Sequence, residues 1–463
     1  MKYGDVVEIN ALERLAQHVL QTRFDDLPPE AVVAAKRFCL DTLGVCVAGT
    51  SAPYAAEVRT VAARWGAGTE ATALGLGEAL PAATAALVNA FHTHNQEYDC
   101  VHELAVVHPL TTIQSAVLAY AERCGGLPGR DVILALVLGV DVATSIGMAA
   151  QSGLSFFRPA TAGIFGVAAA VGKLAGFDHA ALLDAFGLAF VQSGGSMQAH
   201  EEGKPTLALQ MAMAAASGLR AVDLAQAGFP GPHDVLEGRF GYFRLYEGAW
   251  DIGPVWAELG TVWRITQISH KPFPTGRATH GGIDGILQLR AQHALQADDV
   301  ERLILRAPPL IHQLVGRPIQ PQMQANYARL CFQYAGALAL TNGAVDIPDF
   351  RPDRLTDPQV QAVGRRIEVA IDDNPDPNAL APQTVIARLK NGCEYTVDVP
   401  HALGSPQRPL TQEQYLDKFR RCLSYGIRPL AADAPARVID MIDRLDDLDN
   451  TNDMIKALCP IEC

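Results

Sequence analysis

The sequence lacks the motifs that would identify a nucleotide-dependent or secreted protein. It has no GxGxxG turn after an expected strand, no Walker phosphate-binding loop and no GxSxG motif, which argues against a nucleotide cofactor and a serine hydrolase. Its nine cysteines form no CxxC pair, and no basic segment followed by an apolar run opens the chain. We therefore expect reduced thiols, a cytoplasmic location and no cofactor.

Basic residues are scarce relative to acidic ones. Lysine and arginine total 37, aspartate and glutamate total 50, and the formal net charge is −13. This balance argues against nucleic acid or an anionic membrane surface as the main partner, although a local basic pocket could still bind a small anion. The most apolar long stretch, 132–150, contains Asp141 and several small polar residues, so we interpret it as a buried helix.

Long apolar stretches bounded by glycine, proline and aspartate predict a helical first half. The same pattern returns near the C-terminus, where the apolar faces predict packing back onto the first half. The helices expected from these patterns cover residues 10–24, 29–48, 56–66, 80–92, 110–124, 129–150, 163–176, 178–192, about 205–228, 412–424, 433–446 and 450–458.

Short β-branched alternation begins near residue 261. It predicts strands at 261–268, 301–307 and 366–371, and a hairpin at 384–399 around Asn391-Gly392. Helices expected at 278–294 and 327–342 and Pro- and Asp-rich loops at 345–357 and 373–382 complete this region. The predicted fold is mainly α with α+β: a large, discontinuous helical domain, 1–260 and 405–463, and a smaller α+β domain, 261–404.

The densest ionisable cluster lies in residues 89–109, between segments rich in alanine, valine and leucine. It consists of His92, His94, Glu97, Asp99, His102, Glu103 and His108. A solvated loop is one interpretation of this cluster. A metal site is another, because His92 and His94 form a His-x-His pair with Asp99 nearby. We favour general acid–base chemistry, in which neighbouring carboxylates and imidazoles tune each other toward neutrality.

A second group of candidates lies outside this cluster. The loop 269–280 carries Lys271 and Arg277 before an expected helix, an arrangement typical of an anion site. Arg158 precedes an apolar helix and could hold a carboxylate or pair with a structural acid. Lys204 lies in a charged turn, and Tyr334 lies in an apolar helix where a structural role is more common.

These segments resemble the MmgE/PrpD family over nearly the whole chain. The matching stretches include Leu40-Asp-Thr-Leu-Gly44, Asn89 to Pro109, Gly163-Ile-Phe-Gly166, Lys271-Pro-Phe-Pro274 with His280, and Phe332-Gln-Tyr334. The family includes 2-methylcitrate dehydratase, cis-aconitate decarboxylase and iminodisuccinate epimerase. The resemblance implies a helical domain built from both chain ends, a smaller α+β domain and a homodimer. It also implies catalytic roles for Glu97, Asp99, His108, Lys271 and Tyr334.

The chain departs from the family's usual pattern at several positions. Glu97 stands where the dehydratase and decarboxylase branches usually have Asp, and Val101 stands near their usual Thr. Arg158 stands where those branches commonly carry His, and Lys204 is not followed closely by a His. These departures argue against methylcitrate and aconitate as substrates.

We therefore predict a cofactor-independent lyase that removes an α-proton from a small di- or tricarboxylate. His108 or Lys271 is the expected base, and Glu97 and Asp99 orient the imidazoles. The residues expected to bind substrate are Arg158, Arg277, Lys204, His94 and His280. An epimerase of the iminodisuccinate type is the alternative. Two further alternatives are a metal-dependent hydrolase that uses His92, His94 and Asp99, and an inactive binding scaffold. In the favoured interpretation His92 and His102 are peripheral.

Overall fold

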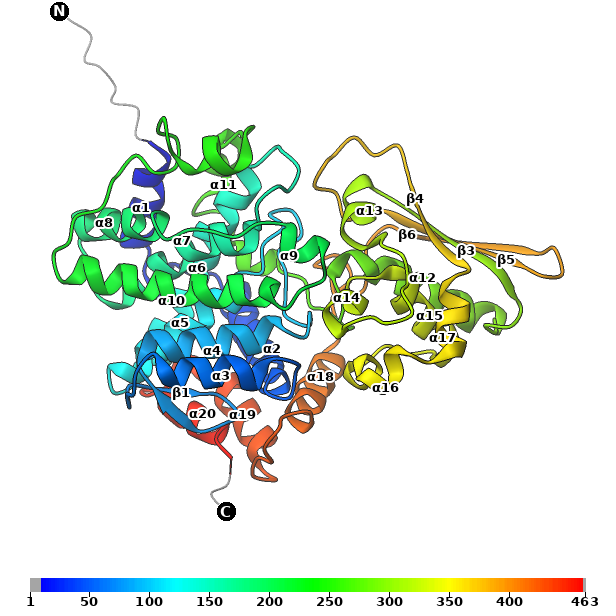
Figure 1. Cartoon of the computed structure of the whole chain (residues 1–463). Helices are drawn as coiled ribbons and strands as arrows, with labels where there is room; N and C mark the ends of the chain where they lie inside the picture. Colours follow the sequence, from blue (N-terminus) through cyan, green and yellow to red (C-terminus); the bar gives the residue numbers. More distant parts are fainter. Residues whose placement is uncertain (1–9, 461–463) are drawn as a thin grey trace, which may run out of the picture.

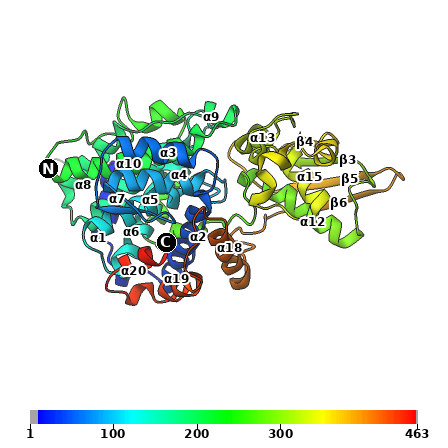
Figure 2. The same cartoon turned by 60° about the horizontal axis from the view of Figure 1, so that its bottom comes forward.

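Two bodies with separate hydrophobic cores make up the fold (Figures 1 and 2). A computed structural model describes residues 10–460. The larger body is helical and contains both ends of the described chain, while the smaller body holds a four-stranded sheet with its helices. The fold class predicted from the sequence is confirmed. The domain boundaries at 260/261 and 404/405 stay a prediction.

The helices of the larger body begin where the sequence offers caps. Asn10 and Asp178 each accept a hydrogen bond from a backbone N–H of the first turn, and proline opens two others at Pro29 and Pro109. These helices are α1 (Ala11–Gln21), α2 (Pro29–Gly49), α3 (Ala55–Arg64), α4 (Ala82–His94), α5 (Pro109–Arg123), α6 (Gly129–Ala149), α7 (Arg158–Leu174), α8 (His179–Phe190), α9 (Gln198–Glu201), α10 (Thr206–Gln226) and α11 (Gly253–Glu258). A short antiparallel pair, β1 (Ala71–Ala73) and β2 (Glu78–Leu80), was not predicted from the sequence.

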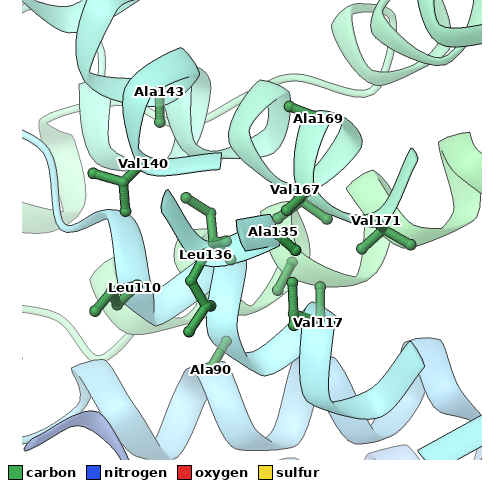
Figure 3. Close-up of a cluster of buried hydrophobic side chains, with 14 of the residues drawn as sticks. Ala90, Leu110, Val117, Ala135, Leu136, Val140, Ala143, Val167, Ala169 and Val171 are labelled. Carbon is green, nitrogen blue, oxygen red and sulfur yellow. The ribbon is translucent and has the colours of Figure 1, made fainter. Parts of the chain in front are cut away.

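The core of this body lies among α4, α5, α6, α7 and α10. Valine, leucine and alanine side chains of α4, α5, α6 and α7 meet there (Figure 3). Small residues let the backbones approach closely: a Cβ added at Gly139 of α6 would lie 2.8 Å from the carbonyl oxygen of Gly166 in α7. Helix α6 is long and apolar enough to cross a membrane, but 94% of its most apolar window is buried inside the fold. It is packed as the core helix that the sequence predicts.

The C-terminal helices pack on the N-terminal part of the chain. They are α18 (Gln412–Ser424), α19 (Ala434–Asp443) and α20 (Asn452–Ala457). Helices α18 and α19 contact α2, and a Cβ added at Gly44 of α2 would lie 2.8 Å from the ring of Phe419. In both views α18 lies beside the smaller body, so the end of the chain reaches the boundary between the two bodies (Figures 1 and 2).

The smaller body is built on a sheet with strand order β4-β3-β5-β6. Strands β3 and β4 are parallel, and the β3–β5 and β5–β6 pairs are antiparallel. The strands are β3 (Val300–Ala307), β4 (Ile367–Ile371), β5 (Gln383–Leu389) and β6 (Glu394–Val399), and the helices are α12 (His280–His293), α13 (Pro309–Val315), α14 (Ala325–Arg329), α15 (Phe332–Asn342), α16 (Pro352–Leu355) and α17 (Pro358–Gly364). Alternate residues of β5 are buried, because α12 and α15 pack against the sheet. The predicted hairpin is confirmed.

Four local predictions were wrong. Residues 261–268 form no strand: Arg264–Gln267 is a short 3₁₀ helix, η3, because the backbone N–H of Arg264 donates to the buried carboxylate of Asp141. The predicted helix 327–342 is broken between α14 and α15, and the predicted loop 345–357 contains α16. Helix α7 begins at Arg158 rather than at residue 163. At Arg264 a tertiary contact thus outweighs the local pattern.

We predict that Gly49→Ala destabilises the protein and disturbs α4. A Cβ at position 49 would lie 1.9 Å from the carbonyl oxygen of His92, so α2 and α4 must separate. Overpacking of this kind costs about 1–3 kcal/mol. Gly153→Ala is the matched control, because nothing lies within 4 Å of an added Cβ there. Urea unfolding measures both variants, and equal midpoints would contradict the packing described.

Candidate active site

The ionisable cluster lies where α4 ends and α5 begins. Helix α4 ends at His94, the connecting loop carries Glu97 and Asp99, and His108 caps the N-terminus of α5. Within that loop Val101 forms an antiparallel bridge to Ser269, with N–H···O distances of 3.0 and 2.8 Å. This bridge brings the Lys271 loop alongside, so residues separated by more than 150 positions meet.

One carboxylate oxygen, Oδ2 of Asp99, organises the cluster. The Nδ1 atoms of His94 and His108 lie 2.8 and 3.0 Å from it, and the Thr111 hydroxyl donates to it at 2.5 Å. The two imidazole rings meet edge to face with centroids 4.9 Å apart. Because the carboxylate accepts from Nδ1 of both rings, it fixes their orientation and directs both Nε2 atoms away from Asp99.

Lys271 and Glu97 form a buried ion pair behind the histidines. The Lys271 ammonium donates to Glu97 Oε2 at 3.0 Å and to the Glu97 carbonyl at 3.2 Å, and it lies 3.5 Å from Oδ1 of Asp99. Glu97 has a φ of 51°, a left-handed conformation that is uncommon outside glycine. The ion pair holds this backbone in place, with the second Glu97 oxygen 3.5 Å from Nε2 of His94.

The surrounding charges shift the pKa values of the two histidines in opposite directions. Burial alone would lower the pKa of His94, but the carboxylates of Asp99 and Glu97 outweigh burial and raise it. The pKa of His108 is lowered, because burial and the Lys271 ammonium outweigh the attraction of Asp99. At Glu97 and Asp99 burial raises the pKa of the carboxyl group, but the nearby Lys271 and histidine charges lower it by more. The pKa of Glu97 therefore falls to about 2, and that of Asp99 falls well below its usual value. His94 therefore holds its proton to a higher pH than His108 does, which suits the first to an acid role and the second to a base role.

Two cations outside the cluster fix the loop backbone. Lys418 of α18 donates to the carbonyl of Tyr98 at 2.9 Å and pairs with Asp41 of α2 at 2.7 Å. Arg329 donates to the carbonyls of Gln96 and Pro274 at 3.0 and 2.8 Å. The loop is thus held by α2, α18 and the smaller body together.

A pocket opens in front of His94 and His108, at the boundary between the two bodies. Its polar lining consists of His94, Glu97, His108, His200 and Arg277. The rest of the lining is apolar. It comes from the loops 101–106 and 154–159, from Met197 and from α10, and, in the chain of the smaller body, from Gly276, Ala278, Leu314, Val315, Leu330 and Leu380. Asp99 and Lys271 lie behind this surface and position the groups that face the pocket.

Several residues predicted to bind substrate are already paired or lie elsewhere. Arg277 lines the pocket, but its guanidinium is held by Glu103 at 2.9 Å and by the carbonyls of residues 270, 402 and 403. Arg158 forms a buried bidentate pair with Glu247 at 2.8 and 2.9 Å. Of the two partners considered for Arg158, a substrate carboxylate and a structural acid, the structure shows the structural acid. Lys204 is exposed and does not line the pocket.

His280 and Tyr334 are buried away from the pocket lining. Nε2 of His280 lies 3.2 Å from the carbonyl of Thr275, within the Lys271 loop. The Tyr334 hydroxyl donates to the carbonyls of Asp349 and Arg354 at 2.8 and 3.1 Å. Neither residue lines the pocket, and the catalytic role predicted for Tyr334 and the substrate contact predicted for His280 stay predictions.

The sequence-based prediction missed His200, which lies just before Lys204 in the same charged turn. It is buried and lines the pocket, because Arg317 from the smaller body donates to its Nδ1 at 3.1 Å and to its carbonyl at 2.8 Å. Burial and Arg317 lower the pKa of His200 to about 3, so its ring is neutral with its proton on Nε2. Arg317 has no carboxylate partner among residues 10–460, and its Nη1 is buried without a hydrogen-bond partner there.

Three possible metal-ligand atoms, one each from His94, Asp99 and His108, lie within 4.8 Å of one another. His92, a ligand in the predicted metal site, does not join them: it is fully buried, and burial lowers its pKa to about 3. Both histidine Nδ1 atoms already bond Oδ2 of Asp99, and the Lys271 ammonium lies 3.5 Å from Oδ1 of the same carboxylate. As arranged, the donor set suits proton transfer better than a dication.

Comparison with known proteins identifies related chains. A family model described as MmgE/PrpD N-terminal domain matches residues 13–254, and one described as MmgE/PrpD C-terminal domain matches residues 273–444. Cis-aconitate decarboxylase of Mus musculus is 27% identical over 92% of this chain and 88% of that protein. The Homo sapiens cis-aconitate decarboxylase is 27% identical over 95% and 92%, and the cis-aconitate decarboxylase-like protein oryM of Aspergillus oryzae is 24% identical over 90% and 91%.

We predict that Lys271→Met destabilises the fold most at neutral pH. Removing one partner of a buried ion pair costs about 3–5 kcal/mol, because the other charge stays buried. The lowered pKa of Glu97, about 2, means that ionised Glu97 stabilises the native protein above pH 4.5, and that this contribution is lost as the pH falls toward 2. The difference from wild type should therefore shrink below pH 4.5.

The measurement is the free energy of unfolding between pH 3 and pH 7. Lys390→Met, at an exposed lysine in the hairpin turn, is the control and should match wild type throughout. A Lys271→Met penalty that is independent of pH would contradict the ion-pair assignment.

Proposed function

Because this chain belongs to the MmgE/PrpD family, we propose that it is a lyase that acts on a small polycarboxylate by acid–base chemistry without a cofactor. The observation that carries the proposal is the pair His94 and His108, which share Asp99 and face one pocket with oppositely shifted pKa values. The relatives named cis-aconitate decarboxylase support a reaction on a tricarboxylate.

The two histidines have different roles in this proposal. His108 is neutral with Nδ1–H bonded to Asp99, so the lone pair on Nε2 can accept the α-proton of a substrate. His94 is protonated and supplies a proton. In a dehydration it protonates the departing hydroxyl; in a decarboxylation it protonates the carbon from which carbon dioxide has left. Both reactions pass through negative charge developing next to a carboxylate, which the cations around Asp99 stabilise.

We infer that the Nε2–H of His200 holds a substrate carboxylate, and that Arg317 lies behind it, outside the pocket lining. The Arg317 guanidinium fixes the His200 tautomer, so the Nε2–H of a pocket-lining imidazole is available as a donor. Arg317 adds a positive charge that no carboxylate of the described chain neutralises. Lys271 and Arg277 are less suited to this role, because Glu97 and Glu103 already pair with them.

An epimerase needs an acid and a base on opposite faces of the substrate. His94 and His108 share one carboxylate oxygen, and their ring centroids are 4.9 Å apart, so they reach the substrate from one side. This arrangement favours elimination or decarboxylation over inversion. A cytoplasmic location and a homodimer, which the sequence predicts, are part of the proposal.

The test is turnover of cis-aconitate and related polycarboxylates in heavy water, followed by NMR. Proton–deuterium exchange, water loss or carbon dioxide release is expected for wild type. His108→Asn keeps an N–H donor for Asp99 but removes the base, so it should lower kcat by roughly 10²–10⁴-fold. His233→Asn, at a half-exposed histidine far from the pocket lining, is the control and should match wild type.

Two results would count against the proposal. One is a panel in which no polycarboxylate exchanges deuterium or is consumed. The other is full activity of His108→Asn. Inversion at a stereocentre without loss of carbon dioxide or water would assign the epimerase activity instead.

A further inference from the structure

A second cleft lies at the boundary between the two bodies, beside the loop between α4 and α5. It is lined by residues that follow α2, by the end of α18, and by the segment 347–352 at the start of α16, which lies beside α18 in Figure 1. Its volume is about 570 Å³, within the range of small-molecule sites, and it shares no lining residue with the pocket of His94 and His108. The polar side chains of the lining are Ser51, Gln96, Arg329, Arg351, Ser424 and Tyr425.

Four of these six polar side chains already donate inside the protein. The hydroxyls of Ser51 and Ser424 donate to backbone carbonyls, and the hydroxyl of Tyr425 donates to a carboxylate. The Gln96 amide donates to a backbone carbonyl at 2.8 Å. The two arginines of the lining are therefore the main donors left for a ligand.

Arg329 is a buried cation that pairs with no carboxylate among residues 10–460. Its side chain is 2% exposed, and the neighbouring carboxylate of Asp346 is already paired with Arg421 at 2.6 Å. Burial lowers the pKa of Arg329 to about 9. A buried charge without a counter-ion is costly, and a bound anion would offset that cost.

The hydrogen bonds of Arg329 leave one edge of its guanidinium free. Nη1 donates to the carbonyls of Gln96 and Pro274, and Nη2 donates once, to Oε1 of Gln96 at 2.6 Å. No described residue accepts from Nε or a second time from Nη2, and these adjacent N–H groups form the fork that binds a carboxylate through two parallel hydrogen bonds. The face of the guanidinium lies over the Phe350 ring, 4.3 Å from its centroid, so the free donors lie along the edge.

The rest of the cleft suits an apolar group and not a second charge. Pro53, Ile347 and Phe350 are among the apolar residues of the lining. The C-terminal ends of α2 and α18 border the cleft, and the partial negative charge at such ends disfavours a further anionic group. Arg351 is exposed, so water screens its charge. The cleft therefore offers one buried positive charge beside an apolar wall.

We propose that this cleft binds a monocarboxylate with an apolar body. The carboxylate accepts from Nε and Nη2 of Arg329, and the body lies against Pro53, Ile347 and Phe350. The ligand is an effector and not a substrate, because the lining contains no His, Lys, Asp or Glu that could transfer a proton. Arg329 also holds the carbonyl of Gln96, next to Glu97, so an occupied cleft restrains the loop of the candidate active site. The inference goes beyond the proposed function and does not depend on it.

The experiment is calorimetric titration of the wild-type protein with hexanoate and with phenylacetate. Acetate lacks the apolar body, and hexanamide lacks the charge. Burial of each methylene raises affinity by up to roughly fourfold, so hexanoate should bind at least tenfold more tightly than acetate. It should also bind at least tenfold more tightly than hexanamide, because the amide cannot pair with the guanidinium. If neither probe binds more tightly than acetate, the inference is wrong.

Two substitutions at exposed positions locate the ligand. Ser424→Trp fills the cleft from the end of α18 and should abolish binding, while Gln412→Trp, on the same helix but outside the lining, should bind as wild type does. Arg351→Gln should weaken binding by about two- to fivefold, and Arg354→Gln, on α16 outside the lining, should not. Arg329→Met removes the fork and should weaken binding at least tenfold.

Leu314→Asp distinguishes the cleft from the pocket of His94 and His108. It places a carboxylate in that pocket, where it would repel a monocarboxylate, and it should leave the affinity for hexanoate unchanged. Binding that is lost in Leu314→Asp but kept in Ser424→Trp would place the ligand in the pocket and overturn the inference. Unchanged affinity in Ser424→Trp would overturn it as well. Neither result bears on the proposed function, which the turnover of polycarboxylates tests separately.

Discussion

The Oδ2 atom of Asp99 is the contact on which the site depends. It accepts from His94, His108 and Thr111, while Oδ1 of the same carboxylate faces the Lys271 ammonium. A buried carboxylate is stable only when donors and cations compensate its lost hydration. Asp99 therefore fixes both imidazoles and, through its charge, raises the pKa of His94, while burial lowers the pKa of His108.

This arrangement requires both bodies of the protein. The helical body supplies α4 and α5, which carry the histidines, and the smaller body supplies Lys271 through the bridge between Val101 and Ser269. Lys418 of α18 adds a third attachment at the Tyr98 carbonyl. Because the loop is held from three directions, it can keep Glu97 and Val106 at positive φ.

The sequence predicted the helices well, because hydrophobic periodicity and caps are local signals. The Asn391-Gly392 hairpin was equally clear, since the turn type depends on those two residues. The prediction of a strand at 261–268 was wrong because the backbone N–H of Arg264 donates a hydrogen bond to Asp141, more than a hundred residues away in the sequence. The apolar pattern of 327–342 is continuous, so it did not indicate that this segment contains two helices.

The candidate site was predicted in composition but not in pairing. Glu97, Asp99, His94, His108 and Lys271 stand out in the sequence as ionisable residues in apolar or proline-rich surroundings, and the structure brings them together. Whether a cation is free or neutralised depends on partners that are distant in sequence. The sequence does not indicate that Glu247 pairs with Arg158 or that Glu103 pairs with Arg277. Nor does it indicate that Arg317 covers His200.

The protonation states of His94 and His108 test the central claim most directly. Side-chain NMR titration of the wild-type protein, with signals assigned by His94→Gln and His108→Gln, gives the two pKa values separately. The structure predicts that His94 keeps its proton above pH 6.5 and that His108 loses its proton below pH 6.5. Titration of both residues together near pH 6.5, or in the opposite order, would contradict the assignment of acid and base.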